Sequence, residues 1–281
     1  MRTQSRDTSP EAERVLIELL RKAPIAKRFG LVRSMTIFAA RLNLKNIQEQ
    51  QLNTDREEEV AKRFVADHYN DNLAKQLYVA LQYHSTRLTA DLLEAILPLS
   101  AVLEKLRIPY YMQGTIANSF YGMQRTTFNV DVVADFYLEQ IGDLQEQLKP
   151  FYAIDVQVMR DATCLRTYFE IVHIESLIMV KVLLSQTFDF ERQIYQRVQQ
   201  HKLSEECQPV CVASPEDIIL TQLRQYRIEG ERADDQWNEI LGVLKVQGTG
   251  LDFAYLEQWA QKLEIVDLLR KGYVDAGLQE A

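Results

Sequence analysis

Residues 114–133 read Gly-Thr-Ile-Ala-Asn-Ser-Phe-Tyr-Gly-Met-Gln-Arg-Thr-Thr-Phe-Asn-Val-Asp-Val-Val. The short aromatic run 108–112 before Gly114 and the alternating run 128–134 both predict strands, and residues 116–123 between them predict a helix. A glycine ahead of a helix lets backbone amides approach an anion, and the helix start adds unpaired N–H groups and a positive dipole end. The stretch therefore predicts a strand–helix–strand unit.

Further elements appear on both sides of this unit. Residues 168–174, 178–184 and 210–213 are strand-like, and Ser214-Pro215-Glu216-Asp217 is a helix start that opens a helical pattern running to the end. The first hundred residues are helical, beginning at Ser9-Pro10-Glu11. We predict an α+β fold: a small mixed sheet with helices, an all-helical region before it and a helical part after it. The expected domains are residues 1–90 and 91–281.

Composition excludes several classes of protein. The chain has 281 residues, of which 47% are hydrophobic and 26% charged, as in soluble globular proteins. No stretch reaches the roughly 18 apolar residues of a membrane span, and the first residues lack the apolar segment of a secretory signal. Three cysteines argue against a disulfide framework and for a reducing compartment. We expect a cytoplasmic protein without membrane contact.

The charge of the chain argues against one class of partner. The net charge is -8, and the first 80 residues hold 14 Lys and Arg against 11 Asp and Glu. The acidic balance therefore lies in the remainder of the chain. A reader of duplex DNA needs many cations to replace phosphate counterions, so we expect no duplex DNA partner.

The quoted stretch resembles the active-site signature of the polymerase-β-like nucleotidyltransferase superfamily. It is most similar to small bacterial nucleotidyltransferases of the abortive-infection and minimal type, and the resemblance covers roughly residues 95–275. It implies transfer of a nucleoside monophosphate from a nucleoside triphosphate, with Mg²⁺ as cofactor. It also implies nucleotide binding by Gly114, Thr115, Arg125 and Thr127, and metal binding by Asp131 with two further carboxylates.

The sequence departs from this family pattern at its centre. Asn129 stands where the family has the first Asp, and a gapless alignment of residues 169–184 places Lys181 at the third carboxylate. Gln222 replaces a usual Lys. The charges of Asp131, Asn129 and Lys181 sum to zero. Two positive unit charges about 4 Å apart repel each other by roughly 4 kcal/mol at an effective dielectric of 20, so an ammonium at this place disfavours a bound cation. Our hypothesis is that an Asp131–Lys181 pair substitutes for the metal.

Two residues on the following strand, His173 and Glu170, are further candidates. His173 matches the family pattern, and a structural role for it is favoured over a catalytic one. Glu170 lies on the other face of that strand, where it is a weak candidate for a replacement carboxylate.

Three hypotheses about function follow. The first is a catalytically impaired nucleotidyltransferase-like protein that keeps a nucleotide pocket and works as a regulator or in a toxin–antitoxin-like pair, with no cofactor required. The second is an active Mg²⁺-dependent transferase that modifies a protein, an RNA or a small molecule. The third is an interaction protein with a vestigial pocket. A protein partner would bind through the N-terminal helices.

Overall fold

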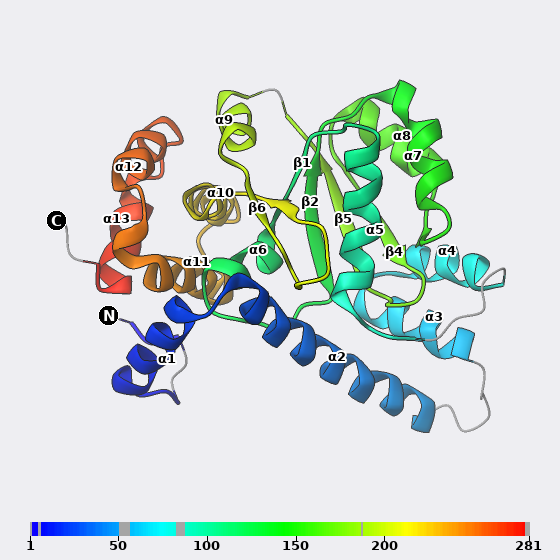
Figure 1. Ribbon diagram of the computed structural model, residues 1–281, viewed down its shortest axis with the longest axis horizontal. Helices are drawn as coiled ribbons and strands as arrows, with labels where there is room; N and C mark the ends of the chain where they lie inside the picture. Colours follow the sequence, from blue (N-terminus) through cyan, green and yellow to red (C-terminus); the bar gives the residue numbers. More distant parts are fainter. Residues whose placement is uncertain (1, 5–6, 51–56, 83–87, 187, 279–281) are drawn as a thin grey trace.

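The computed structural model describes residues 2–4, 7–50, 57–82, 88–186 and 188–278. Its helices are α1 (Pro10–Lys22), α2 (Ile25–Gln50), α3 (Glu57–His68), α4 (Asp71–Leu81), α5 (Leu92–Lys105), α6 (Gly114–Tyr121), η1 (Leu138–Gln140), α7 (Ile141–Leu148), α8 (Val156–Leu165), α9 (Asp189–Arg197), α10 (Pro215–Ile228), α11 (Asp234–Gln247), η2 (Gly248–Gly250), α12 (Phe253–Lys262) and α13 (Val266–Ala276). Its strands are β1 (Tyr110–Gln113), β2 (Asn129–Ala134), β3 (Tyr152–Ala153), β4 (Tyr168–His173), β5 (Met179–Leu184), β6 (Gln199–His201) and β7 (Val210–Val212). The predicted α+β class is confirmed, with helices before and after a mixed sheet (Figure 1). None of the described helices combines the length and the apolar character needed to cross a bilayer.

The strands of the described residues form one seven-stranded sheet in the order β3-β4-β5-β2-β1-β7-β6. β2 runs parallel to β5, whereas β1 is antiparallel to β2 and β4 is antiparallel to β5. The sheet is wider than expected because β3 and β6 were not predicted. β3 has two residues, too few to show a period, and β6 is a polar edge strand.

The two faces of the sheet differ in character because side chains alternate along each strand. On one face Val130, Val180 and Ile171 are fully buried. Helices α5, α7 and α8 lie along one side of the sheet, and α6, α10 and α11 lie on the other (Figure 1). The face opposite to the valines carries Asp131 and Lys181, both only partly buried. The polar residues of the predicted site therefore share one face.

The N-terminal helices pack against one end of this sheet. Phe64 of α3 and Leu77 of α4 are buried in the same hydrophobic cluster as Met179 of β5. The hydroxyl of Tyr69 lies 2.9 Å from the carbonyl oxygens of Phe128 and Leu177. A domain boundary near residue 90 stays a proposal, and the helices before it share their core with the sheet.

α1 packs instead against α11, one of the helices that follow the sheet. The Glu13 carboxylate lies 2.8 Å from the Lys245 ammonium, and both side chains are almost fully buried. The Arg21 guanidinium donates to the carbonyl oxygens of Lys245, at 2.7 Å, and Val246, at 3.0 Å. Arg21 thereby satisfies carbonyls in the last turn of α11, which have no partner within the helix. The first helix is thus fastened to the C-terminal part of the chain.

Candidate functional site

Four side chains from neighbouring strands lie in one row across the sheet. The strand registers place Gln113 beside Asp131, Asp131 beside Lys181, and Lys181 beside Glu170. Residues paired in this way point to the same face. The structure therefore brings together Asp131 and Lys181, which the sequence places at two positions of the family pattern. It also places Glu170, the weak candidate for a replacement carboxylate, on the far side of the lysine.

Asp131 lies tightly against the start of α6. Gly114 has a φ of +68°, and a Cβ on it would lie 3.0 Å from Cγ of Asp131 and closer still to its Oδ2. Burial raises the pKa of Asp131 to about 6, and the carboxylates of Glu239 and Glu170 add to this rise. The positive charge of Lys181 lowers the pKa of Asp131, although by less than burial raises it.

Lys181 does not form a contact ion pair with Asp131. Its ammonium lies 3.9 Å from the centre of the Tyr168 ring, and no ion pair of the described residues joins it to Asp131. A cation above an aromatic face is attracted by the electron-rich ring. Lys181 therefore influences Asp131 through space, from a position that the tyrosine fixes.

A carboxylate lies against α6, among its polar side chains. The side chain of Glu239, from α11, accepts hydrogen bonds from Asn118 at 2.9 Å and Arg125 at 3.1 Å. The Gln222 amide at 3.4 Å and the Thr115 hydroxyl at 3.5 Å also donate to it. Burial raises the pKa of Glu239, and Arg125 opposes that shift. Thr115 and Arg125, both predicted to bind nucleotide phosphates, here bind an internal anion.

Sequence reasoning did not identify Glu239. It lies two residues after Trp237 on a helix whose apolar residues indicate packing. A single glutamate on such a helix is typical of the face that points to solvent. Only the packing of α11 beside α6 brings it to Thr115 and Arg125. Gln222 gave a partial indication of this cluster, because it replaces a lysine of the family pattern and its amide donates to Glu239.

Thr127 holds the start of β2. Its hydroxyl donates to the Asn129 carbonyl at 3.0 Å and accepts from the Asn129 amide at 3.1 Å. The Thr36 hydroxyl of α2 donates to the Thr127 carbonyl at 3.1 Å. These contacts give Thr127 a local structural role, and its predicted role in nucleotide binding stays a prediction. Asn129 is exposed at the beginning of the strand.

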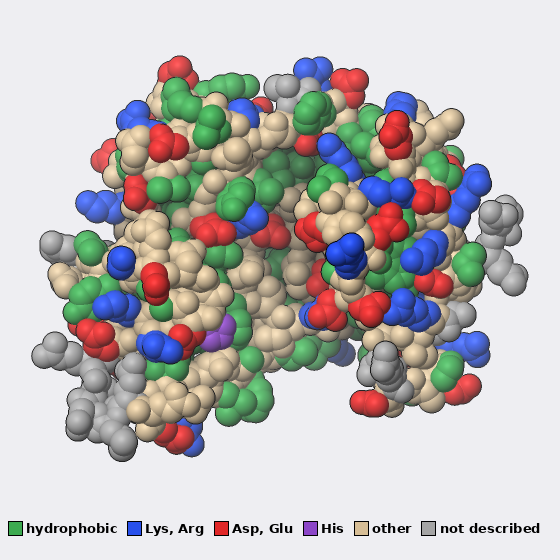
Figure 2. Space-filling view, turned by 180° about the vertical axis from the view of Figure 1, so that it is seen from behind, with side chains coloured by type: hydrophobic (Ala, Val, Ile, Leu, Met, Phe, Trp, Pro, Cys, Tyr) green, Lys and Arg blue, Asp and Glu red, His purple; other side chains and the backbone are tan. Residues whose placement is uncertain are grey.

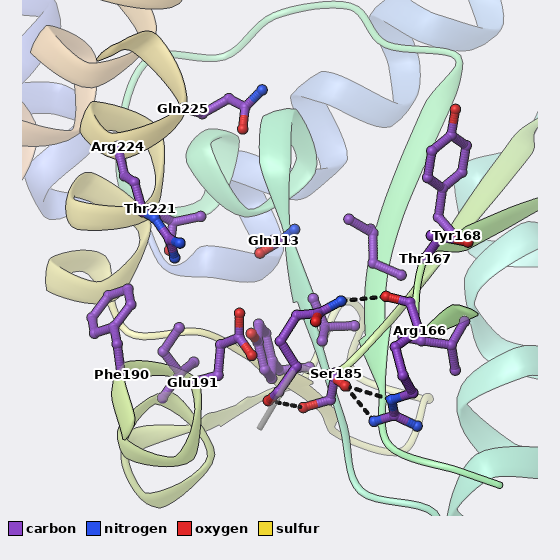
Figure 3. A pocket seen from close by; sticks show the side chains of 16 residues that line it. Gln113, Arg166, Thr167, Tyr168, Ser185, Phe190, Glu191, Thr221, Arg224 and Gln225 are labelled. Atoms are coloured by element: carbon purple, nitrogen blue, oxygen red, sulfur yellow. Dashed lines mark hydrogen bonds between the residues drawn. The ribbon is translucent and has the colours of Figure 1, made fainter. Parts of the chain in front are cut away.

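A cavity of about 410 Å³ lies beside the row of polar side chains. Figure 3 shows that α10 contributes Thr221 and Arg224 on one side, while Gln113 and Tyr168 of the sheet border it elsewhere. Glu191 of α9 lines it as well. The volume falls within the range of small-ligand pockets, and its lining mixes an aromatic ring with polar and charged groups. Lys181, Asp131 and Glu170 do not line the cavity themselves. Lys181 is connected to it through Tyr168, whose ring its ammonium contacts.

His173 has a structural environment. It is buried, and its Nδ1 lies 3.0 Å from the Ser176 hydroxyl and accepts from the Ser176 amide at 3.1 Å. Burial lowers the pKa of His173 to about 4, so the ring is neutral at physiological pH. Such a histidine stabilises the turn between β4 and β5.

The donor set at the row does not match a two-cation centre. No group of three His, Cys, Asp or Glu in the part of the chain that the structure describes could hold a metal ion. Asp131 is the one carboxylate at the three family positions, and Lys181 adds a positive charge beside it. Mg²⁺ binds chiefly carboxylate and phosphate oxygens, so these residues do not fit the magnesium pair that the resemblance implies.

Several solved structures are similar to this chain, and two of them are described here. No protein-family model matches the sequence, and no curated protein matches it. An antigenic nucleotidyltransferase-like protein from Paracoccidioides brasiliensis is 20% identical, with a TM-score of 0.36, over 61% of this chain and 90% of that chain. The antibiotic-resistance factor ANT(2'')-Ia is 14% identical, with a TM-score of 0.37, over 63% of this chain and 90% of that chain. Similarity at this level assigns no family, so the geometry of the site carries the functional argument.

Proposed function

We propose that this chain is a nucleotidyltransferase-like protein that binds a nucleotide but is impaired in its transfer. The observation that carries the proposal is the row in which Lys181 stands between Asp131 and Glu170, with Gln113 at the end of the row lining the cavity. The lysine supplies a positive charge where the resemblance implies a cation. The nucleotide phosphates would approach Lys181 from the cavity, without Mg²⁺.

The chemistry of phosphoryl transfer supports the impairment. Transfer needs the attacking and leaving oxygens held in line and the developing charge neutralised, which bound metal ions do in enzymes of this type. An ammonium can attract a phosphate as a point charge, but it cannot coordinate several oxygens in a fixed geometry. Lys181 therefore suits binding better than transfer.

One observation favours a second function. Glu239 already accepts hydrogen bonds from Thr115, in the first turn of α6, and from Arg125, which follows that helix. If no phosphate displaces it, the pocket is vestigial and the protein works through protein partners. A role as a regulator, or as one half of a toxin–antitoxin-like pair, follows from the family resemblance and belongs to the same proposal.

The test is calorimetric titration of the four ribonucleoside triphosphates, with and without Mg²⁺. The wild type is compared with the Asn129→Asp/Lys181→Asp double variant, which restores the family carboxylates. The matched control is Asn72→Asp/Lys202→Asp, because both residues are exposed and the change in charge is the same. We expect binding by the wild type and the control without Mg²⁺, and Mg²⁺-dependent binding only by the first variant.

Each other outcome contradicts part of the proposal. Mg²⁺-dependent binding by the wild type would mean that the ligand set lies elsewhere, and labelling by a radioactive nucleotide, abolished by Asp131→Ala, would then establish an active transferase. The absence of binding by the wild type, with its circular dichroism intact, would favour the interaction protein.

A further inference from the structure

Helix α2 exposes a line of apolar side chains. Leu31, Met35, Phe38 and Leu42 are 47%, 42%, 65% and 54% exposed, and we call them the α2 stripe. The opposite side of the helix is buried in the protein core, as at Phe29. Hydrophobic side chains emerge at the lower edge of the molecule in Figure 2, where Figure 1 places α2. This helix is therefore apolar on two sides and covered on one.

The spacing of the α2 stripe is that of a helix–helix seam. Its members follow one another by four, three and four residues, the pattern of apolar positions in a coiled coil. On a helix with 3.6 residues per turn they fall within a narrow band. A lone exposed leucine is ordinary on a protein surface, but four in register along one helix form a continuous patch.

The order of the stripe is also symmetric about its middle. When a second α2 is laid antiparallel across it, Leu31 meets Leu42 of the other copy and Met35 meets Phe38. Each contact then occurs twice about a two-fold axis, which is the arrangement of isologous dimers. The largest side chain, Phe38, meets the flexible Met35 at the centre, where packing is tightest.

The flanks of the stripe are compatible with this pairing. In the antiparallel register, Lys27 lies opposite Gln48 of the other copy, and Arg41 lies opposite Ser34. Beyond the stripe, Lys45 falls opposite Arg28 of the other copy, but the Arg28 guanidinium is turned inward and donates to the carbonyl oxygens of Ala23 and Phe120. Exposed like charges, which would disfavour association, therefore do not face each other there. Lys45, whose ammonium is 3.6 Å from the Glu49 carboxylate, ends the apolar line.

The area is sufficient for a small but specific interface. The four side chains expose roughly 400 Å² per copy, which is a full-sized patch for a monomer. With the flanking residues, pairing would bury about 1,000 Å² in total, which is the lower bound for a specific interface.

We propose that two copies of this chain associate through their α2 stripes, antiparallel about a two-fold axis. The proposal is independent of the nucleotide site. It gives a definite form to the partner expected at the N-terminal helices, namely a second copy of the same chain.

The first test is sedimentation velocity of the full chain over a concentration series. We expect a reversible dimer, and at least a 100-fold weaker dimer in the Met35→Gln/Phe38→Gln variant. Val79→Gln/Val274→Gln is the matched control, because both of its residues are 58% or more exposed on other helices. Circular dichroism checks that the variants remain folded. A monomeric wild type at 100 µM concentration, or a stripe variant that dimerises like the control, would refute the proposal.

A second test fixes the direction of the helices. Leu31→Cys and Leu42→Cys are made separately, oxidised alone and as a mixture, and the linked peptides are identified by mass spectrometry, since Cys164, Cys207 and Cys211 are also free thiols. In the antiparallel pair only the mixture links residue 31 to residue 42. The two copies of residue 31 would be about 16 Å apart at 1.5 Å per residue, too far for a disulfide. Self-linked Leu31→Cys dimers would contradict the antiparallel arrangement.

Discussion

At the scale of single residues, the carboxylate of Asp131 is shielded from solvent and has no contact counter-ion among the described residues. Its pKa lies at about 6 instead of 3.8, so the folded chain binds a proton between these pH values that the unfolded chain releases. Stability contributed by the protonated form is complete below pH 4 and is lost as the pH rises through about 6. The wild type should therefore be less stable at pH 7 than at pH 4 on account of this group.

The variant Asp131→Asn tests this dependence. Asparagine is close to the same size and remains neutral, so we expect it to stabilise the protein by roughly 2 kcal/mol at pH 7 to 8, with the difference vanishing near pH 4. Urea unfolding across this pH range measures the difference. A constant difference at all pH values would mean that Asp131 is ionised normally and that the carboxyl group acts only by its contacts.

Gly114 makes a second prediction at the same scale. Its positive φ disfavours any side chain, and a Cβ would overlap the Asp131 carboxylate. We expect Gly114→Ala to lower the free energy of unfolding by about 1–3 kcal/mol, measured by urea unfolding. Gly142→Ala is the control, because nothing lies within 4 Å of its Cβ position and it is helical, so this change should be neutral or stabilising. Equal effects of both variants would show that Asp131 can turn away without loss.

At the scale of elements, the contact between α1 and α11 rests on a buried ion pair. Removing one partner of such a pair leaves an uncompensated charge and typically costs about 3–5 kcal/mol, whereas replacing both by apolar residues is often neutral. We expect this loss for Glu13→Leu, and recovery of most of it in Glu13→Leu/Lys245→Met, by thermal and urea unfolding. If the double variant is as unstable as the single one, the stabilising contact is the hydrogen bond from Lys245 to the Arg2 carbonyl and not the ion pair.

The elements also show which parts of the fold the sequence can predict. Ser9 and Ser214 cap α1 and α10 as predicted, because a hydroxyl before a proline and an acidic first turn is a local signal. β2 was predicted from alternation, and β5 from a strand-like run of residues. β6 was missed because its residues are polar, and α8 was missed although Asp155 caps it with two hydrogen bonds.

The site was predictable to the extent that it lies on single elements. Gly114 and Asp131 lie in one continuous stretch of the sequence. The place of Lys181 follows from the alignment of residues 169–184 with the family pattern, which needs no gap. The position of Glu239 depends on tertiary packing between two helices far apart in the sequence, which no local pattern encodes.

At the scale of the whole molecule, the N-terminal helices complete the core of the sheet. The side chains of Val172, Ile174 and Leu177 are buried in the cluster that α3 and α4 close. We expect a fragment of residues 91–281 to expose them, to bind a hydrophobic dye and to unfold without a sharp transition. Calorimetry of the fragment beside the full chain measures this. A cooperative transition in the fragment would establish the proposed boundary near residue 90 as that of an independent domain.

The contact between α1 and α11 affects the synthesis of the protein in the cell. More than two hundred residues separate Glu13 from its partner Lys245, so the growing polypeptide emerges from the ribosome with its first helix lacking the surface that will cover it. At about 5–20 residues per second, that wait lasts on the order of ten seconds or more. During this interval Ile17 and Leu20, which are buried in the folded protein, are exposed to chaperones or to neighbouring nascent chains, and the contact between the two helices forms only after Lys245 has been synthesised.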